Sequence, residues 1–402
     1  MTSIHDPLDL PIRATRALVD LDAIETNVGV LRSVLHPGCE LLAVVKADGY
    51  GHGASWVARA ALDAGAIALG VATVDEGVSL RLAGITAPIL LIGSIDLLEA
   101  PRACAAHLQM TVGEERLLAE VQRAARLQVG RETVVHVKVD TGLHRYGAAP
   151  DLAVELVRRI HADEHLKLGG ISTHFASADE AEDPFSVEQL SVLDRVLDEV
   201  RTLGIPLPAT HVANSAGTIR GIGTDRSVVR TGIAMYGVPP SDDVPLLSGM
   251  RSALSIESRV TRVARLSPGD AVGYNRTFIS DTDMTVALVP IGYGDGYHRG
   301  LARQGWMGMD NCRARLLGRV SMDQVVVEVP EGLEVCVGDS VQVLSTRREN
   351  AAPTVADLAA MLDTNTYEIL VGLRARIPRV YYRRGDIVAV RTSSMEWQHD
   401  QP

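Results

Sequence analysis

The sequence predicts an α/β fold: an eight-stranded parallel β/α (TIM-like) barrel followed by a mainly-β C-terminal domain. The length of 402 residues exceeds what one ordinary core needs and favours two domains. From Leu41 onward, strand-like and helix-like stretches alternate at spacings of about 25 residues, which implies parallel strands joined by right-handed crossovers. Beyond about residue 240 the chain becomes rich in short alternating strands, which indicates a second kind of domain.

Eight apolar stretches of the first region are the expected barrel strands, because about eight β/α units close such a barrel. They are residues 41–46, 67–72, 89–92, 108–112, 134–139, 168–173, 208–213 and 227–230. Helical patterns lie between them at 54–64, 75–83, 114–127, 151–162 and 184–203. Ahead of the barrel, Asp22 and Glu25 have the spacing of a capping box, so a helix is expected with Asp22 as its N-cap.

The second region begins after the loop at residues 239–243. Strands are expected at 255–265, 284–290, 324–329 and 340–344, and Gly-Asp turns at 269–270, 338–339 and 385–386. Thr354 and Asp357 predict one helix start. We therefore expect a barrel domain over residues 1–248 and a mainly-β domain over residues 249–402. Residues before about 40 are candidates for packing with the second domain.

Composition excludes several classes of function. The formal charge is −11 and no basic stripe stands out, which argues against nucleic acid and anionic membranes as partners. No apolar run approaches the length of a membrane span, and the polar N-terminus lacks a signal-peptide core. The four cysteines have no paired spacing, which fits reduced thiols in the cytoplasm and argues against a zinc site. We expect a cytoplasmic protein without a metal.

The lysines are the most informative residues. Only three occur among 39 basic residues, and Lys46 and Lys138 each end a strand-like run. An amine can lose its proton, form a Schiff base or take up carbon dioxide, and a guanidinium cannot. The carboxyl end of a barrel strand is also where catalytic groups collect. A GC-rich genome that leaves few lysines would explain the rarity of lysine but not its placement. For Lys46 itself, the alternative is a solvated lysine at a strand end.

The residues around Lys46 run Ala-Val-Val-Lys-Ala-Asp-Gly-Tyr-Gly-His-Gly from Ala43 to Gly53. This stretch resembles the pyridoxal-phosphate lysine motif of alanine racemases, A-V-V-K-A-[ND]-A-Y-G-H-G, with Gly49 as a mild variation. The resemblance extends from about Val19 to Val390. It implies an isomerase that interconverts L-alanine and D-alanine and supplies D-alanine for peptidoglycan. Pyridoxal 5'-phosphate would be held as a Schiff base on Lys46.

The resemblance also implies two catalytic bases on opposite faces of the substrate. Lys46 would move the proton of the D-enantiomer, and Tyr274 that of the L-enantiomer. Both groups need a lowered pKa to act near neutrality, and for Tyr274 a cationic neighbour such as His174 or Arg230 would supply it. The family usually has Ser-Tyr-Gly here, so Gly273 and Asn275 are departures beside the base.

Other residues match cofactor contacts of the family. Arg230 would donate to the ring nitrogen, which gives a weaker electron sink than the aspartate of many other pyridoxal enzymes. His211 would lie against the ring face, and His174 would orient a tyrosine. The phosphate contacts implied by the resemblance come from Tyr50, Asn214, Ser215, Gly232, Ile233 and Tyr367. Taken singly, each of these also fits a turn residue, a helix cap or a packed side chain.

Substrate contacts are implied in the same way. Arg145 resembles the arginine that binds the substrate carboxylate, and Met322 with Asp323 resembles a backbone contact to it. Tyr293 resembles a gate at the substrate entrance. Lys138 matches a lysine that is often carbamylated in the family, and the carbamate would position Arg145.

The resemblance implies a head-to-tail homodimer whose sites are shared between subunits, with a small amino acid as substrate. Two rivals fit less well. A pyridoxal-phosphate carrier protein has a single barrel and no region like 250–390, and the motifs of barrel-plus-β decarboxylases are not found. A racemase of serine, or one of broader amino-acid range, remains open.

Overall fold

The computed structural model describes residues 12–128, 130–302, 304–347 and 351–398, which form two compact units. One unit, here called the barrel unit, comprises Ile24–Gly49 and Ala54–Met250. The other, the sheet unit, comprises the described residues up to Ala23, Tyr50–Gly53 and the described residues from Arg251 onward. The N-terminal strand therefore belongs to the sheet unit. The chain also passes into that unit at Tyr50 and returns at Ala54.

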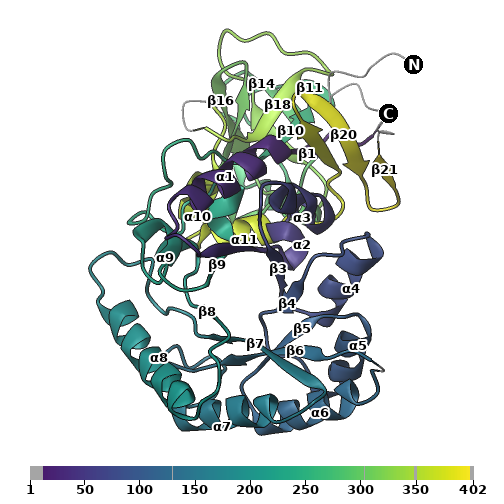
Figure 1. The fold of residues 1–402 in the computed structure, drawn as a ribbon. Coiled ribbons are helices and arrows are strands. Elements are labelled where there is room, and N and C mark those ends of the chain that lie inside the picture. The colour runs from purple at the N-terminus through teal and green to yellow at the C-terminus, as the bar shows by residue number, and fades with distance from the viewer. Residues whose placement is uncertain (1–11, 129, 303, 348–350, 399–402) are drawn as a thin grey trace. The chain divides into compact units, whose positions relative to one another are not determined.

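The barrel unit contains a closed barrel of eight strands in the order β2 to β9, each parallel to its neighbours, and β9 pairs with β2 (Figure 1). The strands are β2 (Glu40–Val44), β3 (Ala68–Val71), β4 (Ile89–Leu91), β5 (Gln109–Val112), β6 (Thr133–Lys138), β7 (Leu166–Ser172), β8 (Ala209–His211) and β9 (Val228–Thr231). Each overlaps one of the eight predicted stretches, so the predicted parallel barrel is confirmed.

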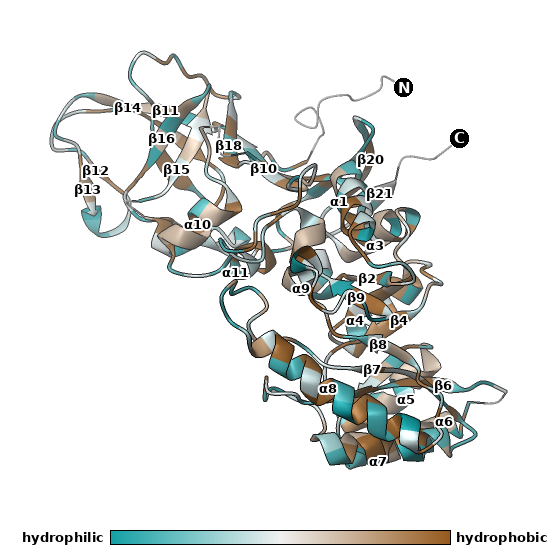
Figure 2. Ribbon diagram, turned by 60° about the vertical axis from the view of Figure 1, so that its left-hand side comes forward, coloured by the Kyte–Doolittle hydropathy of each residue, from teal (hydrophilic) through white to brown (hydrophobic). Residues whose placement is uncertain are grey.

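The helices of the barrel unit are α3 (Ala54–Asp63), α4 (Val74–Leu82), α5 (Ala100–Ala105), α6 (Glu115–Ala125), α7 (Pro150–His161), α8 (Phe185–Thr202) and α9 (Ser215–Arg220), with η2 (Leu97–Glu99), η3 (Ile233–Tyr236) and the short turn α2 (Lys46–Tyr50). Of these, α4 to α8 lie on the outside of the strands (Figure 1). In α8 hydrophobic and hydrophilic residues alternate around the helix, as Figure 2 shows, and Leu193, Val196 and Val200 are buried. The short helices α5 and α9 were not predicted, because six residues are too few for a clear helical period.

The sheet unit is built on an eleven-stranded, mostly antiparallel sheet in the order β11-β14-β17-β16-β15-β18-β10-β1-β19-β20-β21. Its strands are β1 (Arg16–Asp20), β10 (Leu254–Arg259), β11 (Arg262–Leu266), β14 (Met284–Val289), β15 (Trp306–Met309), β16 (Cys312–Leu317), β17 (Val325–Glu328), β18 (Ser340–Leu344), β19 (Arg379–Arg383), β20 (Asp386–Arg391) and β21 (Glu396–Gln398). A separate hairpin pairs β12 (Ala271–Val272) with β13 (Phe278–Ile279). This mainly-β content confirms the predicted class of the second domain.

Short helices complete the sheet unit: α10 (Val355–Met361), α11 (Thr366–Val371), η4 (Tyr274–Arg276), η5 (Tyr293–Asp295) and η6 (Arg299–Leu301). The helix predicted from Thr354 and Asp357 is α10, and the two side chains form the capping box. One cap was predicted wrongly. The helix α1 (Leu21–Ser33) begins ahead of the predicted start, and Asp20 accepts the N–H of Ala23 at 2.9 Å. Asp22 instead accepts the backbone N–H of Arg384.

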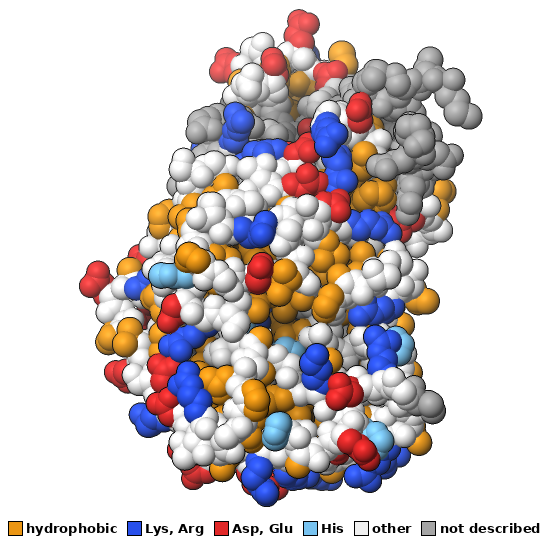
Figure 3. Space-filling view, viewed as in Figure 1, with side chains coloured by type: hydrophobic (Ala, Val, Ile, Leu, Met, Phe, Trp, Pro, Cys, Tyr) orange, Lys and Arg blue, Asp and Glu red, His pale blue; other side chains and the backbone are white. Residues whose placement is uncertain are grey.

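The surface carries mixed charge. On the face drawn in Figure 3, basic and acidic side chains are interspersed. Among the helices that the structure describes, none is both long and apolar enough to cross a bilayer.

Candidate active site

Lys46 lies just beyond the carboxyl end of β2, at the mouth of the barrel. Strand pairing continues past β2 through the N–H of Val45, which donates to Gly70 O at 2.8 Å. The residues that follow Lys46 turn left-handed, with φ near +50° to +60° at Ala47, Asp48 and Gly49. This conformation costs an L-residue with a side chain about 1–2 kcal/mol, so the turn must be held by its surroundings.

Hydrogen bonds within the described part of the barrel unit hold the left-handed turn. The N–H of Gly49 donates to Val45 O at 2.9 Å, and the Asp48 carboxylate accepts the N–H of Ala54 at 3.1 Å. The N–H of Ala47 donates to Glu76 Oε1 at 2.7 Å. Glycine at position 49, where the family motif has alanine, adopts φ +61° without the side-chain cost. The variation therefore favours the turn.

Glu76 connects the ends of two barrel strands. Its Oε2 accepts the N–H groups of Ala72 at 2.7 Å and Thr73 at 3.2 Å, immediately after β3. The pKa of the Lys46 amine is lowered, mainly by burial and then by the charge of Arg145, while Glu76 acts in the opposite direction. Sequence reasoning missed Glu76, although the Thr73–Glu76 capping-box spacing is visible in the sequence.

Arg230, on β9, lies between two histidines. Its Nη1 donates to His211 Nδ1 at 2.9 Å and to His211 O at 2.5 Å, and its Nη2 donates to His174 Nδ1 at 3.1 Å and to Thr173 O at 2.7 Å. The guanidinium is therefore fixed from several sides. Burial lowers its pKa to about 10, so it stays charged at neutral pH.

The two histidines beside Arg230 are neutral. Burial, followed by the charge of Arg230, lowers the pKa of both His174 and His211 well below 6.5. Because Nδ1 of His174 accepts from Arg230, its Nε2 carries the proton and can donate a hydrogen bond. This corrects the expectation that His174 could serve as a cation that lowers the pKa of a tyrosine.

Lys138 ends β6 inside the barrel unit and is buried, with 5% of its surface exposed. Its Nζ donates to Tyr146 O at 3.0 Å and lies 4.6 Å from the centre of the Tyr146 ring. Burial, Arg230 and Arg145 together lower its pKa to about 8, with Asp140 acting the other way. Arg145 itself is exposed on the loop after β6.

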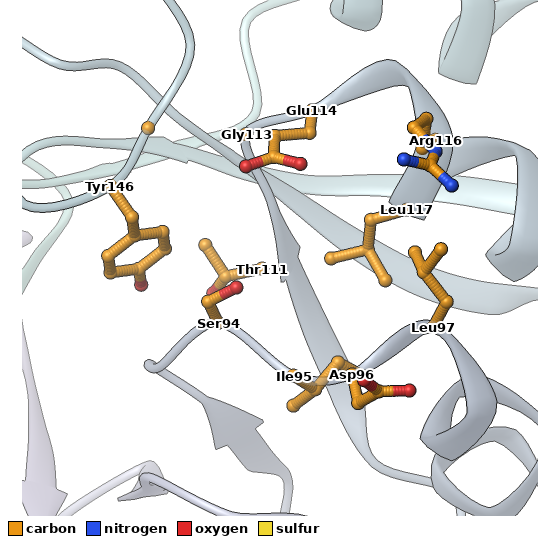
Figure 4. Close-up of a pocket in the computed structure, with 11 residues that line it drawn as sticks. Ser94, Ile95, Asp96, Leu97, Thr111, Gly113, Glu114, Arg116, Leu117 and Tyr146 are labelled. Carbon is orange, nitrogen blue, oxygen red and sulfur yellow. The ribbon is translucent and has the colours of Figure 1, made fainter.

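A cavity of about 150 Å³ adjoins this loop. Figure 4 shows the Tyr146 ring on one side of it and Leu97 and Leu117 on the other. The Tyr146 hydroxyl donates to Ile92 O, which ties the loop to the end of β4. Apart from the Tyr146 contact with Lys138, this cavity does not involve the predicted site residues.

A second group of predicted residues meets where β8 and β9 end. Ser215 is buried, and its Oγ accepts the N–H of Gly232 at 2.9 Å and of Ala234 at 3.3 Å. Asn214 caps α9 by accepting the N–H of Gly217. Ile233 begins η3 beside them. The hydroxyl and the start of two helical turns thus converge, an arrangement suited to an anion such as phosphate.

The sheet unit holds the remaining predicted residues. The rings of Tyr50 and Tyr367 lie 6.2 Å apart, so the two predicted phosphate tyrosines are neighbours. Tyr274 opens η4 between the two hairpin strands and is 71% exposed. The flanking departures from the family pattern fit their backbone, because Gly273 and Asn275 both have positive φ, which asparagine tolerates better than most residues.

Tyr293 and Met322 are also close to each other in the sheet unit. The N–H of Tyr293 donates to Ser321 O at 3.0 Å, and the next N–H donates to Met322 O at 2.8 Å. Both side chains are partly exposed. The side chain of Asp323 accepts a hydrogen bond from Arg376 at 2.7 Å, so its carboxylate is engaged within the unit.

Within each unit the structure thus brings predicted residues together. Lys46, Lys138, Arg145, His174, His211 and Arg230 gather at the carboxyl ends of the barrel strands, and Ser215 joins Gly232. Sequence reasoning missed Glu76, Tyr146, His136 and Gln109. Two of these had a visible signal, since Glu76 has the capping-box spacing from Thr73 and His136 lies two residues before Lys138 on the same strand.

Comparison with known proteins identifies the family. Residues 19–240 match the family described as alanine racemase, N-terminal domain, and residues 253–381 match alanine racemase, C-terminal domain. This chain belongs to the alanine racemase family. It is 38% identical to an alanine racemase of Symbiobacterium thermophilum over 92% of this chain and 97% of that one.

Solved structures of alanine racemases have the same fold. The structure from Clostridium difficile matches with a TM-score of 0.89 and 30% identity over 95% of this chain and 99% of that one. A structure from Bartonella henselae, described with covalently bound pyridoxal phosphate, matches with a TM-score of 0.82 and 25% identity over 92% and 100% of the two chains. Members of the alanine racemase family are pyridoxal-phosphate-dependent isomerases, and the enzyme class and cofactor of this chain follow from its membership.

The residues present fit that cofactor. Lys46 offers an amine whose pKa is lowered at the barrel mouth, and Ser215 offers a buried hydroxyl beside two helical N–H ends. Arg230 offers a charged donor that two histidines hold in place.

Proposed function

We propose that this member of the family interconverts L-alanine and D-alanine with Lys46 and Tyr274 as its two bases. Pyridoxal phosphate supplies the electron sink that makes the proton on the substrate α-carbon removable. The observation that carries the proposal is the Lys46 amine, held at the barrel mouth with a lowered pKa. Lys46 would exchange the proton of the D-enantiomer and Tyr274 that of the L-enantiomer.

Arg230 would hold the ring nitrogen of the cofactor through hydrogen bonds without giving up its proton. Its fixed position between His174 and His211 supports this role. The phosphate contacts that the family resemblance implies would be Asn214, Ser215, Gly232 and Ile233, which lie together where β8 and β9 end, and Tyr50 and Tyr367, whose rings are neighbours.

Arg145 would bind the substrate carboxylate, with Met322 and Asp323 as backbone contacts and Tyr293 at the substrate entrance. The exposure of Arg145 leaves its guanidinium accessible to a small anion. A substrate entrance bounded by a methionine and a tyrosine favours a small side chain such as that of alanine. A racemase with activity on serine or on a broader range is the second candidate, and a chiral assay across amino acids separates the two.

Lys138 would be a carbamate. In this reaction the nitrogen of the neutral amine attacks the carbon of carbon dioxide, a new N–C bond forms, and one proton leaves for the solvent. A pKa of about 8 supports the proposal, because it makes the neutral amine far more abundant near neutral pH than it is in an ordinary lysine. The resulting anion would lie near two cations, Arg145 and Arg230, and would replace a repulsion by an attraction.

The two domains, residues 1–248 and 249–402, would divide the chemistry, since Lys46 lies in the first and Tyr274 in the second. We place the shared sites in a head-to-tail homodimer, and the high exposure of Tyr274 in the single chain supports this. The unpaired cysteines agree with a cytoplasmic enzyme, and the D-alanine formed would supply peptidoglycan.

Two experiments test these assignments. Borohydride treatment of the purified enzyme should fix the cofactor to the peptide that contains Lys46, and a label on Lys138 or Lys167 would reject the anchor. For the shared site, inactive Lys46→Ala and Tyr274→Phe proteins are mixed. Random exchange should restore roughly a quarter of all sites if they are shared, because about half the dimers are mixed and each has one complete site. Exchange confirmed by native mass spectrometry without recovered activity would contradict a shared site.

A further inference from the structure

A second histidine lies behind His211 inside the barrel. His136, on β6, is buried, and its Nδ1 is 2.9 Å from Nε2 of His211. The two rings meet edge to face, with their centres 5.1 Å apart. On its other side, Nε2 of His136 is 3.1 Å from Oε1 of Gln109 on β5. Barrel interiors are usually filled by apolar side chains, so a buried pair of imidazoles needs a reason.

Arg230, His211, His136 and Gln109 are linked by a hydrogen-bond chain, and its hydrogen bonds have one consistent direction. Arg230 has only donors, so Nδ1 of His211 must accept and its Nε2 must carry the proton. Nε2 of His211 then donates to Nδ1 of His136, which places the proton of His136 on Nε2. That proton is donated to the amide oxygen of Gln109, which can only accept. Each of the three contacts therefore pairs one donor with one acceptor.

Both imidazoles must be neutral for this chain to exist. A proton added to Nδ1 of His211 would face the N–H of Arg230, and one added to Nδ1 of His136 would face the N–H of His211. Burial, with the charge of Arg230, lowers the pKa of His136 to about 4, in agreement with the geometry. This hydrogen-bond chain ends at Gln109, near the opposite face of the barrel. There Gln109 lines a cavity of about 160 Å³ among the starts of β4, β5 and β6.

The neighbouring strand β7 leaves space for the His136 side chain. The pairing of β6 with β7 skips one residue between Leu168 and Gly170, which leaves Gly169 as a bulge opposite His136. A Cβ atom at Gly169 would overlap Nε2 of His136, and one at Gly170 would overlap its Nδ1. The Gly-Gly pair in β7 thus makes room for the imidazole.

We propose that His136, together with Gln109, is a positioning residue that fixes the tautomer of His211 and thereby the direction in which Arg230 presents its N–H groups. The proposal rests on the cofactor-facing role of Arg230 proposed above. Removing His136 would leave the Nε2 proton of His211 buried without an acceptor. The ring would then turn or change tautomer, and its contact with Arg230 would weaken.

The tautomers are measured directly on the wild-type holoenzyme labelled with ¹⁵N-histidine. At neutral pH, two-bond ¹H–¹⁵N spectra should show His136 and His211 as neutral rings with the proton on Nε2. Signals are assigned by the loss of one resonance in His136→Asn. A charged ring, or a proton on Nδ1 of either residue, would overturn the proposal. The spectra are recorded on the wild-type enzyme, and His136→Asn is the one variant that must fold for this measurement.

Kinetics separates positioning from a general structural effect. We expect His136→Leu to lower kcat for alanine about 10-fold with little change in KM, because one buried hydrogen bond to Arg230 is weakened. His136→Asn, although its side chain is smaller, offers Oδ1 where Nδ1 was and should recover most of the rate. The exposed His107→Leu serves as a control for loss of a histidine.

Gly170→Ala displaces the imidazole without changing its chemistry, and it should reproduce the effect of His136→Leu. If His136→Leu does not fold, Gln109→Leu removes only the final acceptor and should lower kcat in the same direction. Equal rates for the leucine and asparagine variants of His136 would refute the positioning role. If the wild-type enzyme did not racemise alanine, the proposed function would fail, while the measured tautomers would still decide the hydrogen-bond chain.

Discussion

The buried amine of Lys138 should make the stability of this enzyme depend on pH and on carbon dioxide. Its pKa of about 8 in the folded protein compares with 10.5 for an ordinary lysine. The folded state therefore disfavours the ammonium form. The difference corresponds to about 3 kcal/mol of destabilisation at pH values below the folded pKa.

The sign of the pH dependence follows from proton binding. Between pH 8 and 10.5 the unfolded chain still holds a proton on this lysine, whereas the folded protein has released it. Stability therefore rises with pH across that window. Carbamylation should also stabilise the folded protein, at lower pH. Carbon dioxide reacts with the neutral amine, which is about 300-fold more abundant in the folded protein than in an ordinary lysine.

The perturbation is Lys138→Met, which keeps a long unbranched side chain and removes the charge. In buffer free of carbon dioxide at about pH 7, we expect this variant to be more stable than wild type by up to about 3 kcal/mol. The advantage should disappear by about pH 10.5. Added bicarbonate should stabilise the wild type and leave Lys138→Met unchanged. The exposed Lys167→Met is the matched control and should respond to neither condition.

Thermal unfolding of the holoenzyme, followed by circular dichroism at several pH values with and without bicarbonate, measures these effects. The reasoning would be refuted if Lys138→Met were no more stable than wild type at neutral pH without carbon dioxide. An advantage that stays constant up to pH 10.5 would also refute it. Loss of the bicarbonate effect alone would reject the carbamate but keep the buried amine.

Two further predictions concern the turn after Lys46. At Gly53, φ is +101° and a Cβ would overlap the Tyr381 hydroxyl; at Gly385, φ is +85° but the space is open. Gly53→Ala should therefore lower the melting temperature by more than Gly385→Ala. Equal losses would mean that the overlap is relieved at no cost. Glu76→Gln removes a charge that raises the pKa of Lys46, so the rate at which stripped protein takes up pyridoxal phosphate should reach its plateau at lower pH than in wild type. An unchanged pH profile would show that the Glu76 charge does not reach the amine.

Local sequence patterns determined the fold class of this protein. The eight barrel strands could be predicted because each is a short apolar run bounded by turn residues, and burial on both faces requires such runs. The helix that starts after Thr354 could be predicted because a capping box depends only on residues three positions apart. The motif around Lys46 is equally local, and its eleven consecutive residues are enough to indicate the cofactor.

The start of the first helix could not be predicted from local spacing. The sequence favoured Asp22 as the cap because Glu25 follows it at the right spacing, and Asp20 was not predicted. In the structure β1 runs up to Asp20, so the helix starts at once and Asp20 is placed to cap it. The pairing of β1 with β10 and β19, which lie more than two hundred residues away, decided the outcome.

The environment of the site depended on tertiary structure alone. His136 lies 75 residues before His211 and 27 after Gln109. The three side chains meet because their strands belong to one closed barrel and share its interior. Likewise, the lowered pKa of Lys138 comes from burial and from Arg230 on another strand. Residue type shows that a histidine or lysine can change its protonation, but only the fold decides which groups surround it and therefore which form it takes.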